Sequence, residues 1–182
     1  ANNFPIAQIV KGQPIGPFSG MLRASGTGFD VLSPHSSLTA DAQINGLTYD
    51  HYNLSGIHLA ANTRGGHATA QFKANNPLIE AEGRLEALFL KHGYELALQA
   101  SLPNLDFKRL GIAKDTLFFG TDIDLKATAD KSFKYYTLVG GIRHNRFTTP
   151  RMSSMAKDIL FDLSSQRDTT TAFISAGDLT LN

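Results

Sequence analysis

The fold is decided by residues 78–100, which read LIEAEGRLEALFLKHGYELALQA. From Ile79 to Phe89 the odd positions are apolar or glycine, whereas charged side chains occupy most of the positions between them. This period of two predicts a strand with one apolar face. The alternation resumes from Tyr94 to Ala100, and Gly93 offers the positive φ that would close a tight turn. The two runs therefore predict a hairpin with the cross-strand pairs Phe89–Tyr94, Ala87–Leu96, Leu85–Leu98 and Gly83–Ala100.

The same alternation recurs along the chain and predicts ten to twelve strands in one all-β domain spanning residues 1–182. Turns are expected at Asn45–Gly46, at residues 62–66, at residues 75–77 and at residues 130–132, where glycine, asparagine, aspartate and proline gather. Residues 147–155 give no clear pattern. The predicted strands occupy residues 18–30, 38–44, 47–51, 54–61, 68–74, 79–89, 94–100, 123–129, 135–142 and 159–163, with one or two more in 169–181.

Two short helices are predicted to interrupt the strands. The first begins near Pro5, a residue suited to the first helical position, and ends before Gly12. The second covers residues 102–111, where Asn104 is a capping residue and Gly111 can end the helix. No helix-period stretch reaches the roughly 12 residues of a convincing core helix.

Composition excludes several classes of function. The chain has 17 Lys and Arg residues against 16 Asp and Glu residues, and no basic run that would indicate a nucleic-acid partner. It has no cysteine, which excludes thiol catalysis, disulfides and thiolate metal sites. No window approaches the roughly 20 apolar residues of a spanning helix. Since the last residues still follow a strand pattern, we expect the chain to be a piece of a longer protein.

No constellation of side chains indicates an enzyme, a metal centre or a cofactor. The six histidines have no ligand-type spacing, and no serine lies in a nucleophile-elbow frame. Asp122 and Asp124 share a strand face and could bind a cation or act as an acid–base pair, but a solvated outer face explains them better. The basic run from Arg143 to Arg146 could take an anionic group, and a polar hairpin tip explains it equally well.

The apolar positions have two interpretations of comparable weight. They form the core of a closed β-sandwich, or they line an open groove that meets lipid. The many alanines on this face give a shallow wall that leaves room for acyl chains. The candidate groove-lining residues are Ile79, Ala81, Leu85, Ala87, Phe89, Tyr94, Leu96, Leu98, Ile123, Leu125 and Ala127.

A family resemblance favours the groove. Residues 102–111, which read LPNLDFKRLG, followed by Leu117-Phe118-Phe119-Gly120 at the start of an alternating strand, resemble the repeated segments of the TamB family of translocation and assembly proteins and their AsmA-like relatives. The run from Phe4-Pro5-Ile6 to Phe18-Ser19-Gly20 is similar.

The resemblance implies a curled antiparallel or mixed sheet that forms a taco-like groove with an apolar interior, in a periplasmic protein tethered to the inner membrane through another part of the chain. It implies a phospholipid or other acyl-chain ligand, or an outer-membrane β-barrel client, and a role in lipid transport or outer-membrane protein assembly. It implies no catalytic residues. The alternative is a closed β-sandwich module of a surface or adhesive protein that binds glycan or acts structurally.

Overall fold

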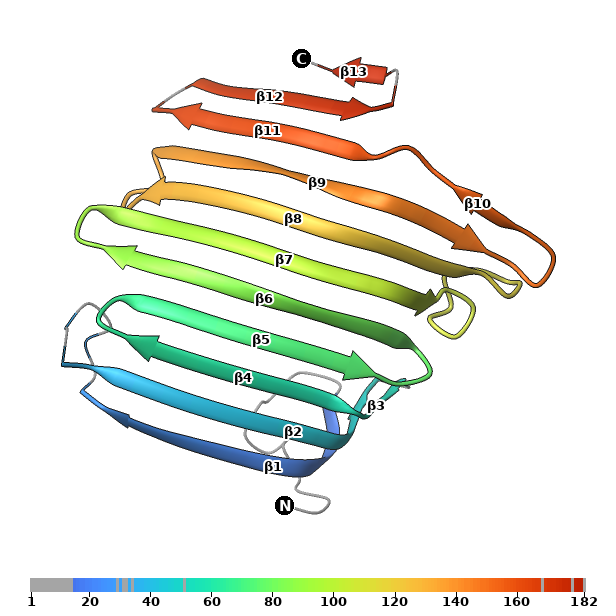
Figure 1. Cartoon of the computed structure of the whole chain (residues 1–182), viewed down its shortest axis with the longest axis horizontal. Helices are drawn as coiled ribbons and strands as arrows, with labels where there is room; N and C mark the ends of the chain where they lie inside the picture. The colour runs from blue at the N-terminus through green and yellow to red at the C-terminus, as the bar shows by residue number, and fades with distance from the viewer. Residues whose placement is uncertain are drawn as a thin grey trace.

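The computed structural model describes residues 15–28, 30, 33, 35–50, 52–167, 169–177 and 179–181. They form thirteen strands in one sheet (Figure 1). The strands are β1 (Ile15–Thr27), β2 (Ser37–Tyr49), β3 (Tyr52–Leu54), β4 (Ile57–Arg64), β5 (His67–Asn75), β6 (Ile79–Leu90), β7 (Gly93–Asp106), β8 (Phe118–Asp130), β9 (Tyr135–Thr148), β10 (Ser153–Met155), β11 (Ile159–Gln166), β12 (Thr169–Ala176) and β13 (Leu179–Leu181).

The sheet is an antiparallel meander in which each strand pairs with its neighbours in the sequence. The order is β1-β2-β4-β5-β6-β7-β8-β9-β11-β12-β13, with β3 on β2 and β10 on β9. β1 and β13 lie at opposite edges, so the sheet is open (Figure 1). The predicted all-β class and the single curled antiparallel sheet are therefore confirmed. Short turns that alternate from one end of the strands to the other produce this topology without any crossover.

The hairpin of β6 and β7 has the predicted register. Phe89 pairs with Tyr94, Leu85 with Leu98, and Gly83 with Ala100. The predicted role of Gly93 is wrong, because Gly93 is not among the residues with positive φ. A Cβ atom at this position would lie 2.2 Å from the carbonyl oxygen of Ala129. Glycine is needed here because β8 approaches closely.

Two local predictions are wrong and one cannot be judged. Asn45–Gly46 is not a turn, because β2 continues through it to Tyr49 and Gly46 pairs with Ser19 on β1. The helix predicted over residues 102–111 is absent: β7 extends to Asp106, and only one turn follows, in which the Leu110 amide donates to the Asp106 carbonyl. The helix predicted near Pro5 lies outside the described residues.

A line of irregularities crosses the sheet and bends it. The register shifts at Ser19/Gly20 between β1 and β2, at Glu80/Glu82 between β6 and β7, and at Gly120/Asp122 between β8 and β9. The chain breaks between β3 and β4 and between β10 and β11 fall on the same line. β3 and β4 both pair with β2, and β10 and β11 both pair with β9. Bulges increase local twist and bend strands, so the aligned bulges curl the whole sheet.

Polar side chains join the strands along this line. Asn145 is 4% exposed, and its amide accepts from the Thr121 hydroxyl at 2.8 Å and donates to the carbonyls of Ile142 and Lys157. Farther along the same line, Asn76, which follows β5, donates to the carbonyl of Ser55 between β3 and β4 at 3.0 Å. These bonds satisfy backbone groups that the bulges remove from the ladder.

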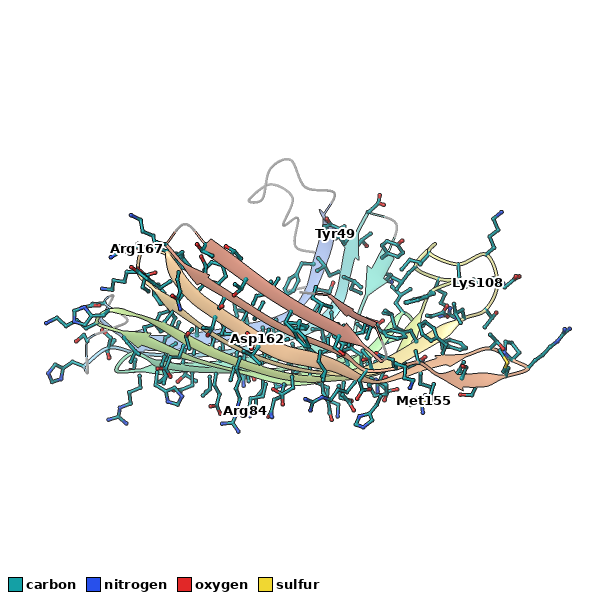
Figure 2. The ribbon with its side chains drawn as sticks, turned by 90° about the horizontal axis from the view of Figure 1, so that it is seen from above. Tyr49, Arg84, Lys108, Met155, Asp162 and Arg167 are labelled. Atoms are coloured by element: carbon teal, nitrogen blue, oxygen red, sulfur yellow. The ribbon has the colours of Figure 1, made fainter. Side chains whose placement is uncertain are left out.

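The described residues contain almost no conventional core. Ala74 and Ala81 are the buried apolar residues, and no large side chain is fully buried. Figure 2 shows why: the strands form one bowed layer, without a second sheet among the described residues. One face of the bow is concave, and Arg84 points away from it on the convex side (Figure 2).

Candidate functional site

The concave face is apolar from one side of the sheet to the other. The cross-strand partners define three rows that run from β1 to β12, and Thr63 is the single polar residue in them. Nine strand spacings of about 4.8 Å make each row roughly 43 Å long. The first row is Leu22, Ala42, Leu59, Phe72, Gly83, Ala100, Ile123, Ile142, Ile159 and Ala176; the second is Ala24, Ala40, Ala61, Ala70, Leu85, Leu98, Leu125, Gly140, Phe161 and Ile174; the third is Gly26, Leu38, Thr63, Ala68, Ala87, Leu96, Ala127, Leu138, Leu163 and Ala172.

The residues between these rows face the convex side and are largely polar. Arg84, which Figure 2 places on that side, forms an ion pair with Glu86 at 2.5 Å. Lys73 on β5 forms another with Glu82 on β6 at 3.6 Å. All four side chains are about half or more exposed, so these pairs add little stability. The sheet is therefore amphipathic, with charged side chains on its convex face and apolar side chains on its concave face.

The structure places all eleven predicted groove-lining residues on this concave face. Nine belong to the three rows or to the adjoining pair Phe89–Tyr94, whose rings meet edge to face at 6.2 Å. Ile79 and Ala81 lie at the line of bulges, where Ala81 pairs with Ala74. Leu96 is 38% exposed and Leu59, in the first row, is 43% exposed. Large apolar side chains on this face thus remain open to solvent.

Small residues keep the concave face shallow. A Cβ atom at Gly83 would lie 2.5 Å from the ring of Phe72, which shows that the ring covers the glycine. At Gly140 a Cβ atom would lie 2.8 Å from a methyl group of Leu125. Large side chains therefore lie flat over small neighbours, and the concave face stays smooth because few side chains project from it.

Beyond the line of bulges lies an aromatic cluster that the sequence did not reveal. The rings of Phe107 and Phe119 stack at 5.7 Å, and Phe119 meets Phe147 at 4.9 Å. The Tyr52 hydroxyl donates to the carbonyl of Leu110 at 2.7 Å, which ties β3 to the loop after β7. These residues come from separate segments of the chain. The cluster extends the apolar surface past the line of bulges, onto the smaller part of the bent sheet.

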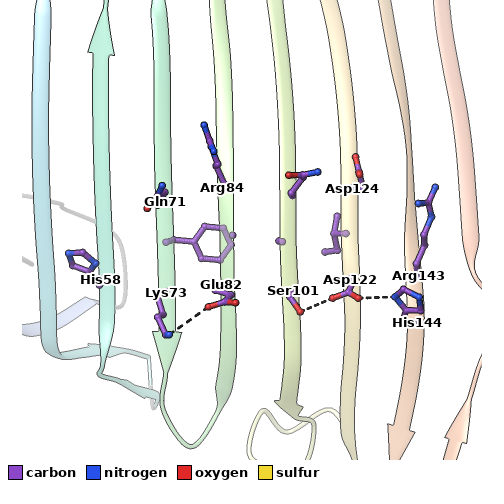
Figure 3. Close-up of a pocket in the computed structure, with 15 residues that line it drawn as sticks. His58, Gln71, Lys73, Glu82, Arg84, Ser101, Asp122, Asp124, Arg143 and His144 are labelled. Carbon is purple, nitrogen blue, oxygen red and sulfur yellow. Dashed lines mark hydrogen bonds and ion pairs between the residues drawn. The ribbon is translucent and has the colours of Figure 1, made fainter.

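A polar hollow of about 640 Å³ contains Asp122 and Asp124 (Figure 3). Ser101 donates to one oxygen of the Asp122 carboxylate at 2.7 Å, and His144 contacts the other at 2.8 Å. These hydrogen bonds, that of Ser101 first, lower the pKa of Asp122. Because the Asp122 carboxylate lies between Ser101 and His144, the imidazole does not contact the serine hydroxyl. The arrangement Ser–Asp–His therefore does not activate the serine as a nucleophile.

The basic run from Arg143 to Arg146 is not a hairpin tip, because it lies inside β9. His144 has a φ of 53° at the bulge, which turns its ring toward Asp122, whereas Asn145 is buried in the bend. Arg146 donates to the carbonyl of Pro103 at 3.2 Å. Within the described residues, no three His, Asp or Glu side chains are grouped closely enough to hold a metal ion.

The described part of the chain contains no helix long and apolar enough to cross a membrane. Comparisons of the chain with protein-family models, with curated proteins and with solved structures each gave no match.

Proposed function

We propose that this chain is a segment of a TamB-like cell-envelope protein whose concave face shields lipid acyl chains from water. The observation that carries the proposal is the apolar face, three rows deep and ten strands wide, in which Thr63 is the single polar residue and which no second layer of the described residues covers. Exposed apolar patches of this extent mark binding surfaces. The resemblance to the TamB family supports a periplasmic location, with the membrane tether in another part of the protein.

The energetics suit a conduit for lipid. Removing about a dozen methylene groups from water at about 0.8 kcal/mol each gives roughly 10 kcal/mol, enough to retain a lipid. Since alanine and leucine recur along each row, a sideways step exchanges one hydrocarbon contact for another of similar strength. Retention is then strong, while movement along the rows meets a nearly flat free-energy profile.

The closed sandwich, the other interpretation of the sequence, requires a second sheet over the apolar rows. The described residues supply none, because all thirteen strands belong to one layer. A client strand of an outer-membrane protein is a second candidate occupant. The observation that favours it is the position of β1, a 13-residue strand that pairs only with β2 among the described strands, since extended segments bind sheets by adding to such edge strands.

Native mass spectrometry and organic extraction of the purified chain test the proposal. We expect co-purifying phospholipid in the wild type and its loss in Leu98→Asp, which places a charge in the second row. Gln99→Asp is the matched control, because Gln99 lies one residue along the same strand, is exposed, and faces the polar side. A wild-type chain that binds neither lipid nor a dye for apolar surfaces contradicts the proposal.

A further inference from the structure

The turns at one end of the strands carry a row of cations. The β6–β7 turn contains Lys91, the β8–β9 turn contains Lys131 and Lys134, and the β11–β12 turn contains Arg167. Figure 1 shows these three turns at the same edge of the sheet, the left, and Figure 2 shows Arg167 at one end of the bow and Lys108 at the other. We call these three turns the hairpin rim.

The lysines of the hairpin rim are available to a ligand. Lys91, Lys131 and Lys134 are exposed and have no ion-pair partner among the described residues. Asp130 is the described acid of these turns, and its carboxylate accepts from the Tyr135 amide at 2.9 Å and from Ser132. Asp168, which follows Arg167 in the sequence, lies outside the described residues.

An aromatic layer separates these cations from the aliphatic rows. Phe89 contacts Tyr94 edge to face, and Tyr94 stacks on Phe133 of the β8–β9 turn at 5.6 Å. Phe133 is 63% exposed. Arg167 donates from Nε to the Tyr135 hydroxyl at 2.5 Å and from its amide to the Lys134 carbonyl at 2.9 Å, which ties two turns together.

The order of side chains from the floor of the groove to the rim is aliphatic, aromatic, cationic. The same order matches a lipid from its acyl chain through the ester region to its phosphate. From Tyr94 to Leu102, eight residues along β7, the strand rises roughly 26 Å, more than the roughly 15 Å of one leaflet's hydrocarbon. An acyl chain laid along the strand from the rim therefore stays on the apolar face.

The opposite end of the strands is a poorer match. Its largest loop, between β7 and β8, carries Lys108, Arg109 and Lys114 beside Asp106 and Asp115, and Arg109 already contacts Asp106 at 3.4 Å. Three cations and two acids nearly balance there, whereas the described turns of the hairpin rim hold four cations and one acid.

We infer that the hairpin rim binds the phosphate of an anionic phospholipid whose acyl chains lie across the concave face, so that the lipid enters in one orientation. This inference rests on the proposed function and adds the class of headgroup and the orientation of the bound lipid. Each lysine near the phosphates contributes roughly fivefold in affinity at low salt. Three lysines together then contribute on the order of 100-fold, and screening beyond about 10 Å at 0.1 M salt reduces this.

The test compares retention of phosphatidylglycerol and phosphatidylcholine with identical acyl chains, by native mass spectrometry of the delipidated full chain. We expect the wild type to prefer phosphatidylglycerol by 10- to 100-fold at low salt, and the triple variant Lys91→Gln/Lys131→Gln/Lys134→Gln to lose the preference while still binding both lipids. The matched control, Lys108→Gln/Lys114→Gln/Lys126→Gln, removes the same charge away from the rim and should keep the preference. Glycerol 3-phosphate, which has no acyl chain, should not compete.

The outcomes separate the two hypotheses. Equal retention of both lipids by the wild type, an unchanged preference in the rim variant, or an equal loss in the control variant would overturn the headgroup inference and leave acyl-chain binding intact. Absence of any lipid on the wild type would overturn the proposed function as well. Competition by glycerol 3-phosphate would show that the rim recognises free phosphate and would refute the lipid orientation.

Discussion

Replacing Leu98 with alanine is expected to destabilise the chain by only about 1 kcal/mol, although Leu98 lies in the middle of the apolar surface. Full burial of the three lost carbons would contribute roughly 2.4 kcal/mol at about 0.8 kcal/mol each. Leu98 is only partly buried, between Leu85 and Leu125 in its row, and about half of that contribution is at stake. No cavity is created, because no second layer of described residues covers the position. A closed core would instead lose about 2–5 kcal/mol.

Urea unfolding of the delipidated protein measures this difference, provided that the slope against urea is unchanged. Leu85→Ala should behave like Leu98→Ala because the two side chains are partners, and Gln99→Ala should change stability by less. A loss of 3 kcal/mol or more at Leu98 would refute the reasoning, since it would require packing above the row. Adding lipid should raise the stability of the wild type, because binding to the folded state alone stabilises it.

The remaining predictions concern Asn145 at the bend of the sheet, Gly93 where β8 approaches closely, and the titrating carboxyl group of Asp122. Asn145→Ala should cost about 2–4 kcal/mol, more than Leu98→Ala, because it leaves buried partners at the bulge unsatisfied, and urea unfolding measures the order of the two. Gly93→Ala should cost about 1–3 kcal/mol, since its Cβ atom would meet the Ala129 carbonyl oxygen, and a thermal melt equal to that of the wild type would contradict this. Hydrogen bonds lower the folded-state pKa of Asp122 below its ordinary value of 3.8, so its contribution to stability is present above that pH and is lost as the pH falls through the lowered value. The stability difference between the wild type and Asp122→Asn should therefore narrow in acid, and unfolding midpoints measured across this range test it.

The errors of the sequence-based predictions share a physical cause. Asn45–Gly46 is a strong local turn signal, yet β1 pairs along both sides of it, and the dipeptide lies where the two strands lose register. Asn104 suggested a helix cap, but it pairs with Glu80 in β7, at a register shift where the missing amide proton of the neighbouring Pro103 breaks no ladder bond. In both places long-range pairing overrode the local preference of the residues.

By itself, the sequence determined most of the strand segments, the apolar face of those that alternate clearly, and the register of the hairpin from Ile79 to Ala100. It could do so because side chains alternate with a period of two, and a slip by one residue would expose the apolar set. Only the tertiary structure decided that the bulges align into one bend and that three phenylalanines from distant segments meet. Only the tertiary structure, too, decided that the described strands form a single layer, because alternation marks an apolar face without specifying what covers it.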